Sequence, residues 1–433
     1  MKDDRTKTLP IALGAVVLSC VILSVLFALF GCGAKDKGAK DGAANDPEVP
    51  EVTEDAPPTY GVFIPSVYNL AFPSKPDLPA DELRTEIDAI VEGASEIGLD
   101  ALYFQVRPEC DALYASKIFP VSKYLSSDGT LTLDCLEYMV SAAHAKGIAV
   151  TAWINPFRVT VNKATLSDLP VSSPAATTLY DDVVSYGGKL YFDPASPAVR
   201  RLICDGVAEI VENYDVDGII FDDYFYPYVV YETDADGNSI AAAFDDAKSF
   251  AASGGTSLAD FRRENVNALI KDVYLTVKDA RVSCRFGVAP FGIWKNDDGS
   301  NGGSMTSGLE SYSELFCDTL AWVEGGYVDY IAPQIYWRCD SLTASFKVLA
   351  AWWEKKLERS SVDLLISHAA YCYGDGSFDA GELTKQLDIA SRNDHYRGSI
   401  FYSWAAFRDD LSGICTEITR YISDTVTARS ARS

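Results

Sequence analysis

Histidine is scarce in this chain, and several metal and nucleotide signatures are missing. The 433 residues include only His144, His368 and His395, with no His-x-x-x-His spacing and no Cys-x-x-Cys pair. Structural and catalytic zinc sites are built from such ligands at short spacing, so we expect no metal site, and a metal-dependent sugar deacetylase is disfavoured. No Gly-x-Gly-x-x-Gly turn follows the first predicted strand. This absence disfavours an open doubly wound sheet that binds a dinucleotide. We expect no bound cofactor.

Basic residues are also few. Lys and Arg number 37 against 62 Asp and Glu, which gives a formal charge of −25. Nucleic acid binding requires clustered basic side chains, so we expect no nucleic acid partner. An anionic membrane surface is disfavoured as the main partner for the same reason. The charge favours a neutral substrate, and we expect a monomer.

One long apolar run is present, from Ile11 to Phe30, after the basic residues Lys2, Arg5 and Lys7. Gly31-Cys32 follows at once. This order is typical of an export signal. A cysteine after a small residue resembles the bacterial lipoprotein signal, which predicts a signal peptide over 1–31 and a lipidated Cys32. The alternative is a single uncleaved transmembrane helix, since the run is long enough to span a bilayer. Both alternatives tether the protein at the extracytoplasmic face of the cell membrane.

The segment after the signal differs in composition from the rest of the chain. Residues 32–58 hold Gly, Ala, Lys, Asp, Pro and Glu without a hydrophobic period, which predicts a disordered linker. We expect one domain over 59–425 and a flexible tail over 426–433. Of the ten cysteines, eight lie beyond residue 32. Most of these are expected to be buried apolar residues, and export is compatible with one or two disulfides.

Short apolar runs alternate with helical patterns through the domain. Eight runs read as strands, at 60–64, 101–106, 148–154, 218–222, 286–290, 329–336, 364–368 and 399–404. Residues with helical periodicity lie between most of them, at 82–97, 136–146, 197–214, 260–278, 342–357 and 381–392. Eightfold alternation predicts an α/β fold, a (β/α)8 TIM barrel with long loops at the C-terminal face of the strands. An open doubly wound sheet is the alternative.

Polar and aromatic side chains follow the predicted strands. The central stretch of the predicted site is the run Val216–Pro227, which reads as a buried strand that ends in Asp222-Asp223. Barrel active sites lie at the C-terminal ends of the strands. Aromatic faces stack on sugar rings, and amides and carboxylates form hydrogen bonds with hydroxyl groups. This set of side chains at the strand ends therefore predicts a carbohydrate-binding cleft. The residues predicted to bind the substrate are Arg107, Asp111, Asn155, Arg158, Tyr224, Trp294, Gln334, Tyr336, Trp337 and Trp404.

Six motifs in order resemble the glycosyl hydrolase-like 10 family. They are Phe104–Pro108 with Asp111–Tyr114, Trp153–Arg158, Tyr191–Pro194, Val216–Pro227, Ala289–Trp294 and Pro333–Trp337. The similarity runs from about Tyr60 to about Trp404. The resemblance implies a TIM-type barrel, an exported bacterial protein often made as a lipoprotein, and glycosidase activity on a bacterial polysaccharide.

Asp222 and Asp223 are the predicted catalytic pair. Glycoside hydrolysis usually needs a proton donor and a second carboxylate. Residues 364–372, where many barrel glycosidases keep a nucleophile, contain no Asp or Glu. In a 2-acetamido sugar, the substrate's own carbonyl oxygen can attack the anomeric carbon instead. We assign Asp223 as general acid/base and Asp222 as the group that orients the acetamido, which requires the strand to end near Asp222 because strand side chains alternate.

Other interpretations of the same residues stay open. A non-catalytic polysaccharide-binding barrel is the alternative function, in which the acidic pair is structural. One aspartate would then bond Arg107 or Arg158, and the other would cap a loop. Aromatic residues also fill barrel cores. His368 is predicted to be a core histidine, and Asp193-Pro194 to start a helix as cap and first residue. Asp234–Asn238 is predicted to form a turn rather than a calcium loop. The favoured function is hydrolysis of an N-acetylhexosamine-containing glycan such as peptidoglycan strands.

Overall fold

The computed structural model describes residues 58–233 and 237–430. The predicted signal peptide over 1–31, the lipidation site Cys32 and the linker up to residue 57 lie outside the described residues. The predicted turn at Asp234–Asn238 falls largely on residues 234–236, which also lie outside them. No helix in the described part of the chain is long and apolar enough to cross a membrane.

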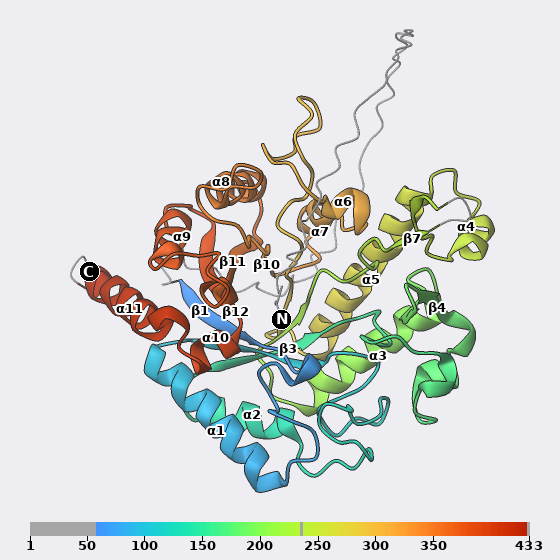
Figure 1. Cartoon of the computed structure of the whole chain (residues 1–433), viewed down its shortest axis with the longest axis horizontal. Helices are drawn as coiled ribbons and strands as arrows, with labels where there is room; N and C mark the ends of the chain where they lie inside the picture. Colours follow the sequence, from blue (N-terminus) through green and yellow to red (C-terminus); the bar gives the residue numbers. More distant parts are fainter. Residues whose placement is uncertain (1–57, 234–236, 431–433) are drawn as a thin grey trace, which may run out of the picture. The chain divides into compact units, whose positions relative to one another are not determined.

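Eight parallel strands close into a barrel, which confirms the predicted (β/α)8 fold. Each strand pairs with the next, and the last pairs with the first. Helices surround the strands on the outside (Figure 1). The barrel strands are β1 (Thr59–Ile64), β2 (Ala101–Arg107), β3 (Ala149–Ile154), β6 (Gly218–Phe221), β9 (Arg285–Val288), β10 (Tyr330–Ile331), β11 (Asp363–Ala369) and β12 (Tyr396–Tyr402).

Six of the helices lie where the periodicity predicts them, within a few residues at each end. They are α1 (Ala80–Ile97), α2 (Cys135–His144), α3 (Pro197–Asn213), α5 (Leu258–Ala280), α8 (Phe346–Leu357) and α9 (Glu382–Ala390). In α1 the buried residues include Leu83, Ile87, Ile90 and Ala94, the positions that the helical pattern marks as apolar. The helix ends at Gly98, whose φ of 88° suits a left-handed cap.

The remaining elements lie mostly in the long loops and at the C-terminus. The additional helices are α4 (Ala247–Ser253), α6 (Ser311–Glu314), α7 (Thr319–Glu324), α10 (Trp404–Arg408) and α11 (Ile414–Ser430). Two antiparallel hairpins are β4–β5 (Val183–Tyr186, Lys189–Phe192) and β7–β8 (Tyr231–Thr233, Ser239–Ala241). Short 3-10 turns are η1 (Val67–Asn69), η2 (Leu166–Asp168), η3 (Pro174–Ala176), η4 (Tyr180–Asp182), η5 (Ala370–Tyr373) and η6 (Leu411–Gly413).

The barrel interior is packed with large side chains rather than open. An inner cluster includes Phe63, Tyr103, Ile220, Tyr330 and Leu365, all buried. Space for the Tyr330 ring comes from a glycine: a Cβ at Gly287 would lie 2.2 Å from the ring. This filled interior holds the strand ends above it at fixed positions.

Two predictions of local structure differ from the structure. Helix α3 begins at Pro197, and Ser196 caps it by accepting a hydrogen bond from the Val199 N–H at 3.3 Å. Asp193 is therefore not the cap; its side chain closes a turn by accepting from the Ala195 N–H at 2.9 Å. Helix α11 continues to Ser430, so residues 426–430 are helical rather than a tail.

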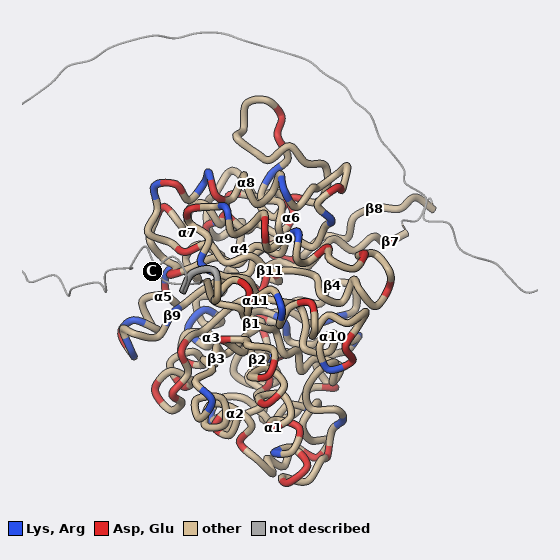
Figure 2. The backbone as a smooth tube through the Cα atoms, turned by 90° about the vertical axis from the view of Figure 1, so that its left-hand side faces the viewer, with Lys and Arg blue, Asp and Glu red and all other residues tan. Residues whose placement is uncertain are grey.

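The eight cysteines that the structure describes are all free thiols, and five of them are buried. Charged residues of both signs are scattered over the tube in Figure 2, and in the coloured part of that view the basic positions form no continuous stripe.

Candidate active site

A cavity of about 440 Å³ opens at the C-terminal ends of the barrel strands. It brings together six of the residues predicted from the sequence: Asp222, Asp223, Tyr224, Gln334, Tyr336 and Trp337. Seven further residues line it: Phe63, Trp153, Tyr228, Ala289, Phe291, Tyr371 and Tyr402. The two aspartates are the only carboxylates among these lining residues.

Both aspartates reach the cavity because the strand ends just before them. Strand β6 stops at Phe221. Ile220 belongs to the inner barrel cluster, whereas Phe221 packs against Phe286 at a ring distance of 5.3 Å. Strand alternation therefore directs Asp222 inward, and the turn after the strand brings in Asp223. The strand thus ends just before Asp222, as the assignment of both aspartates to the catalytic pair requires.

Asp222 is held by hydrogen bonds from neutral donors. It is 5% exposed and accepts from Trp153 Nε1 at 3.1 Å and from Asn155 Nδ2 at 3.1 Å. The backbone N–H of Tyr224 donates to it at 3.3 Å. Burial raises the pKa of Asp222, and the Arg158 charge together with these bonds opposes the rise. The side chain is thus fixed in orientation as an acceptor.

Asp223 has a different environment. It is 2% exposed, and it accepts hydrogen bonds from the Tyr228 hydroxyl and from Gln334 Nε2, the latter at 3.0 Å. Burial and then the neighbouring charge of Asp222 raise the pKa of Asp223 to about 6. A carboxyl with this pKa keeps its proton in a useful fraction of molecules near neutral pH, as a general acid requires.

Gln334 is placed at the mouth by backbone pairing on both sides. Its backbone forms single bridges with Phe291 and with Ser367, although strand β10 itself is only two residues long. The Nε2 group also donates to the Ala289 carbonyl at 2.8 Å, so both amide hydrogens are engaged. The side chain is therefore a fixed donor to Asp223.

Aromatic rings form most of the cavity wall. Trp337 meets Phe291 edge to face at 5.4 Å, and Tyr336 lies 6.1 Å from Tyr402. Such rings offer flat apolar faces for sugar rings. Tyr228 was missing from the residues predicted to bind substrate, although it ends the aromatic run that follows the acidic pair. Phe63 and Trp153 are on barrel strands with inward side chains, which is the signal that points to them.

Two predicted residues stand behind or beside the cavity rather than in its lining. Asn155 is fully buried and supports Asp222. Arg158 is half-buried; its guanidinium lies 5.1 Å from the ring centre of Tyr224, and its Nε donates to the Pro108 carbonyl at 2.9 Å.

The structure does not bring Arg107 or Asp111 into this cavity. The Arg107 guanidinium is buried 3.5 Å above the Phe119 ring, next to Gly206 of helix α3, on the outer side of the barrel. A register shift near the end of strand β2 accompanies this direction. Asp111 lines a second cavity of about 650 Å³ with Glu109. Burial, then the Glu109 charge, raises the pKa of Asp111.

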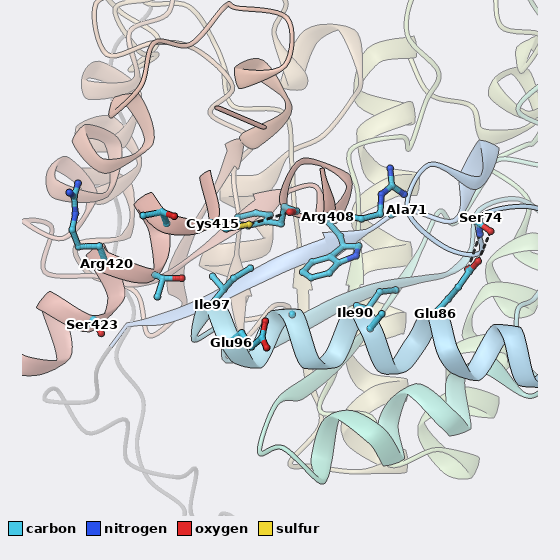
Figure 3. Close-up of a pocket in the computed structure, with 16 residues that line it drawn as sticks. Ala71, Ser74, Glu86, Ile90, Glu96, Ile97, Arg408, Cys415, Arg420 and Ser423 are labelled. Atoms are coloured by element: carbon cyan, nitrogen blue, oxygen red, sulfur yellow. Dashed lines mark hydrogen bonds between the residues drawn. The ribbon is translucent and has the colours of Figure 1, made fainter. Parts of the chain in front are cut away.

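Trp294 and Trp404 also lie elsewhere. Trp294, on the loop that follows β9, stacks on Trp352 at 5.9 Å. Trp404 lines another cavity, of about 910 Å³, between α1, α10 and α11 on the outside of the barrel. Figure 3 shows this cavity, with Ile90 and Ile97 on one side and Cys415 and Arg420 on the other. It contains neither aspartate of the pair.

His368 is a core residue, as predicted. It is fully buried, with Nδ1 2.8 Å from Gln386 Oε1 and Nε2 2.8 Å from Ser399 Oγ. Burial lowers the pKa of His368 to about 4, so the ring is neutral at physiological pH. Over the residues that the structure describes, no group of three His, Cys, Asp or Glu side chains is arranged to hold a metal ion.

A filled (β/α)8 barrel with a buried acidic pair and aromatic walls at its C-terminal mouth has the architecture of a glycoside hydrolase. Residues 58–378 match the glycosyl hydrolase-like 10 family, and the chain belongs to that family. It is 34% identical over 363 residues to the glycosyl hydrolase YngK of Bacillus subtilis, covering 82% of this chain and 69% of the relative. The glycosyl hydrolase DigH of Escherichia coli K12 is 34% identical over 374 residues, with coverage of 80% and 82%. By class the protein is a glycosidase.

Solved structures share the fold at low sequence identity. The glycoside hydrolase domain of PgaB (BpsB) from Bordetella bronchiseptica has a TM-score of 0.54 and 13% identity, covering 83% of this chain and 98% of that domain. The alpha-L-fucosidase isoenzyme 2 of Paenibacillus thiaminolyticus has a TM-score of 0.52 and 12% identity, covering 86% of this chain and 49% of that one.

Proposed function

We propose that this protein hydrolyses an N-acetylhexosamine-containing glycan, with peptidoglycan strands as the substrate and Asp222 and Asp223 as the catalytic carboxylates. The observation that supports this most is that the two aspartates have different environments. Asp222 is fixed as an acceptor by Trp153 and Asn155, while the pKa of Asp223 is raised to about 6. With no third carboxylate among the residues that line the described cavity, the nucleophile is supplied by the substrate.

In the first step Asp223 gives its proton to the glycosidic oxygen as the bond to the anomeric carbon breaks. The acetamido carbonyl oxygen of the same sugar attacks that carbon and forms a cyclic oxazolinium ion. Asp222 accepts a hydrogen bond from the acetamido N–H, which holds the oxygen in line and stabilises the positive charge. The hydrogen bonds from Trp153 and Asn155 keep the Asp222 carboxylate in place for this contact.

In the second step the leaving sugar is replaced by water. Asp223, now a carboxylate, takes a proton from the water as its oxygen attacks the anomeric carbon, and the ring of the oxazolinium opens. The acetamido group and the protonated Asp223 are restored. The anomeric configuration is retained, because the two displacements occur on opposite faces in turn.

We also propose that the enzyme acts outside the cytoplasmic membrane, tethered through a lipid on Cys32. The basic residues, the apolar run from Ile11 to Phe30 and the Gly31-Cys32 pair support this.

The test is an assay of the purified protein on peptide-stripped peptidoglycan glycan and on chitooligosaccharides, with products read by mass spectrometry. Asp223→Asn and Asp222→Asn are expected to lower kcat by about 10²–10⁴-fold. Asp245→Asn is the matched control, since Asp245 is exposed on the same loop after β6 and lies outside the cavity lining.

Each outcome has a defined meaning. Wild-type cleavage of either glycan that both pair variants lose, with Asp245→Asn active, supports the pair as catalytic. Cleavage that survives both substitutions overturns the site. A thiazoline analogue of the oxazolinium should inhibit, and cleavage of plain β-glucan at a comparable rate would refute the participation of the acetamido group.

A further inference from the structure

Arg158 is built into the network that holds Asp222. Its backbone N–H donates to Asn155 Oδ1 at 3.2 Å, and Asn155 Nδ2 in turn donates to Asp222 at 3.1 Å. The Arg158 side chain is anchored at its Nε, which donates to the Pro108 carbonyl at 2.9 Å. Backbone and side chain are thus both fixed beside the acidic pair.

The far end of the guanidinium lies beside Tyr224. It lies 5.1 Å from the ring centre of Tyr224, which lines the cavity and is 38% exposed. Within the described ranges 58–233 and 237–430, no carboxylate forms an ion pair with Arg158, and the two terminal nitrogens make no hydrogen bond to protein. An arginine stacked on an aromatic ring with its terminal N–H groups free is suited to bidentate binding of a carboxylate.

The lining of the cavity contains no cation, and Arg158 lies beside it. Its lining contains two buried carboxylates and neither Lys nor Arg, in a chain with a net charge of −25. An anionic sugar in this cavity would be repelled unless a positive group lay next to it. Arg158 is the positive group whose charge acts on Asp222.

Arg158 is on the Asp222 side of the pair. Its backbone N–H bonds Asn155, which in turn bonds Asp222, whereas Asp223 is bonded by Tyr228 and Gln334. In the proposed function Asp222 holds the acetamido group at C2 of the sugar. A substituent on the neighbouring C3 oxygen leaves the ring on that same side, and a carboxyl group at C5 lies across the ring.

We propose that Arg158 is a specificity-determining residue that binds a carboxylate carried on the C3 oxygen of the sugar held by Asp222. The chemical class is a 2-acetamido sugar with an acidic 3-O-ether, of which muramic acid is the member present in peptidoglycan. This inference rests on the proposed function, and it adds the residue that distinguishes such a sugar from a neutral N-acetylhexosamine.

The experiment compares two forms of one substrate. Peptide-stripped glycan strands are assayed with the muramic carboxylate free, and again after its reduction to the alcohol, by the purified protein and its variants. For wild type we expect kcat/KM on the carboxylate form to exceed that on the reduced form by about tenfold to a hundredfold. In Arg158→Met this ratio should fall to about one, while Arg158→Lys keeps the charge without the planar fork and should give an intermediate ratio.

The ratio distinguishes carboxylate recognition from a general loss of activity. Any effect of Arg158 on Asp222 changes kcat/KM for both forms of the substrate by the same factor. Lys163→Met is the matched control: it removes one positive charge from an exposed residue of the same loop and should keep the wild-type ratio. A wild-type ratio in Arg158→Met, or an equal loss in Lys163→Met, overturns the inference.

Two further outcomes are distinguishable. If neither form of the glycan is cleaved by wild type, the proposed function fails. If a hexosamine–uronic acid oligosaccharide is cleaved with the same dependence on Arg158, the carboxylate is read at C5 and the assignment to C3 is refuted.

Discussion

The two carboxylates of the cavity are adjacent in sequence, and their partners differ completely. Asp222 is bonded by an indole N–H and an amide, and Asp223 by a tyrosine hydroxyl and a glutamine amide. Because the two charges are close, ionisation of one opposes ionisation of the other. The pKa of Asp223 is raised to about 6, and this residue is the one suited to exchange a proton with the substrate.

A pH profile tests this assignment. A general acid must be protonated, so kcat/KM should fall as the pH rises through about 6, the pKa of Asp223. The Tyr228 hydroxyl bond favours the ionised form and lowers that pKa, so its removal should raise it. We expect Tyr228→Phe to move the alkaline limb to higher pH. Tyr231→Phe, at an exposed tyrosine three residues further along the chain, is the control, and an unmoved limb in Tyr228→Phe would contradict the assignment.

A second residue-scale prediction concerns stability. The Asp223 pKa in the folded protein, about 6, is above its ordinary value of 3.8. For a carboxyl this means that folding stability falls as the pH rises from about 4 to about 6 and stays lower above that range. Asp223→Asn removes the ionisation, so at pH 7.5 it should unfold at a temperature equal to or above that of wild type while activity is lost. Calorimetry at pH 7.5 measures this; a clear decrease in Tm would show that Asp223 is a structural residue.

At the scale of elements, the C-terminal helix α11 closes the ring of helices against α1. Ile418 is fully buried on α11, whereas Thr416 is exposed on the same helix. The segment had no place among the helices predicted from the sequence, yet its buried residues belong to the main core.

Substitution in this helix measures how much it contributes. Ile418→Ala should lower the free energy of unfolding by about 2–5 kcal/mol, because it leaves a cavity in the core. Thr416→Ala should change it by no more than about 0.5 kcal/mol. Urea titration of both variants provides the comparison. Equal effects of the two substitutions would mean that α11 does not pack as described.

For the whole molecule, the proposed tether is tested by labelling. Cells given an alkyne fatty acid should label the wild-type protein, and Cys32→Ala should abolish the label and accumulate an uncleaved precursor. Cys20→Ala, within the apolar run, is the matched control and should be labelled normally. A membrane-bound, unlabelled wild-type protein would instead indicate an uncleaved transmembrane helix.

Sequence alone determined the barrel and the centre of the site. Apolar runs of strand length and helical periodicity are local patterns, and their eightfold alternation has few closed solutions, so the fold and the position of Asp222-Asp223 after the fourth barrel strand followed directly. Tyr224, Gln334, Tyr336 and Trp337 line the same cavity as the pair, because each follows a strand whose end faces the same mouth of the barrel.

Tertiary structure decided which strand-end residues actually reach the cavity. All three of Arg107, Trp404 and Phe63 lie on or next to barrel strands. The Arg107 side chain points away from the barrel axis and covers Phe119, and Trp404 packs between outer helices. The Phe63 side chain points into the barrel and lines the cavity. The direction of a side chain at the end of a strand depends on register shifts and on the conformation of the first loop residues. The sequence pattern does not encode either of these. The hydrogen bonds that set the environment of each carboxylate also come from groups distant in the chain: Gln334 is 111 residues from Asp223, and Asn155 is 67 residues from Asp222. Burial and these long-range bonds exist only once the barrel has closed.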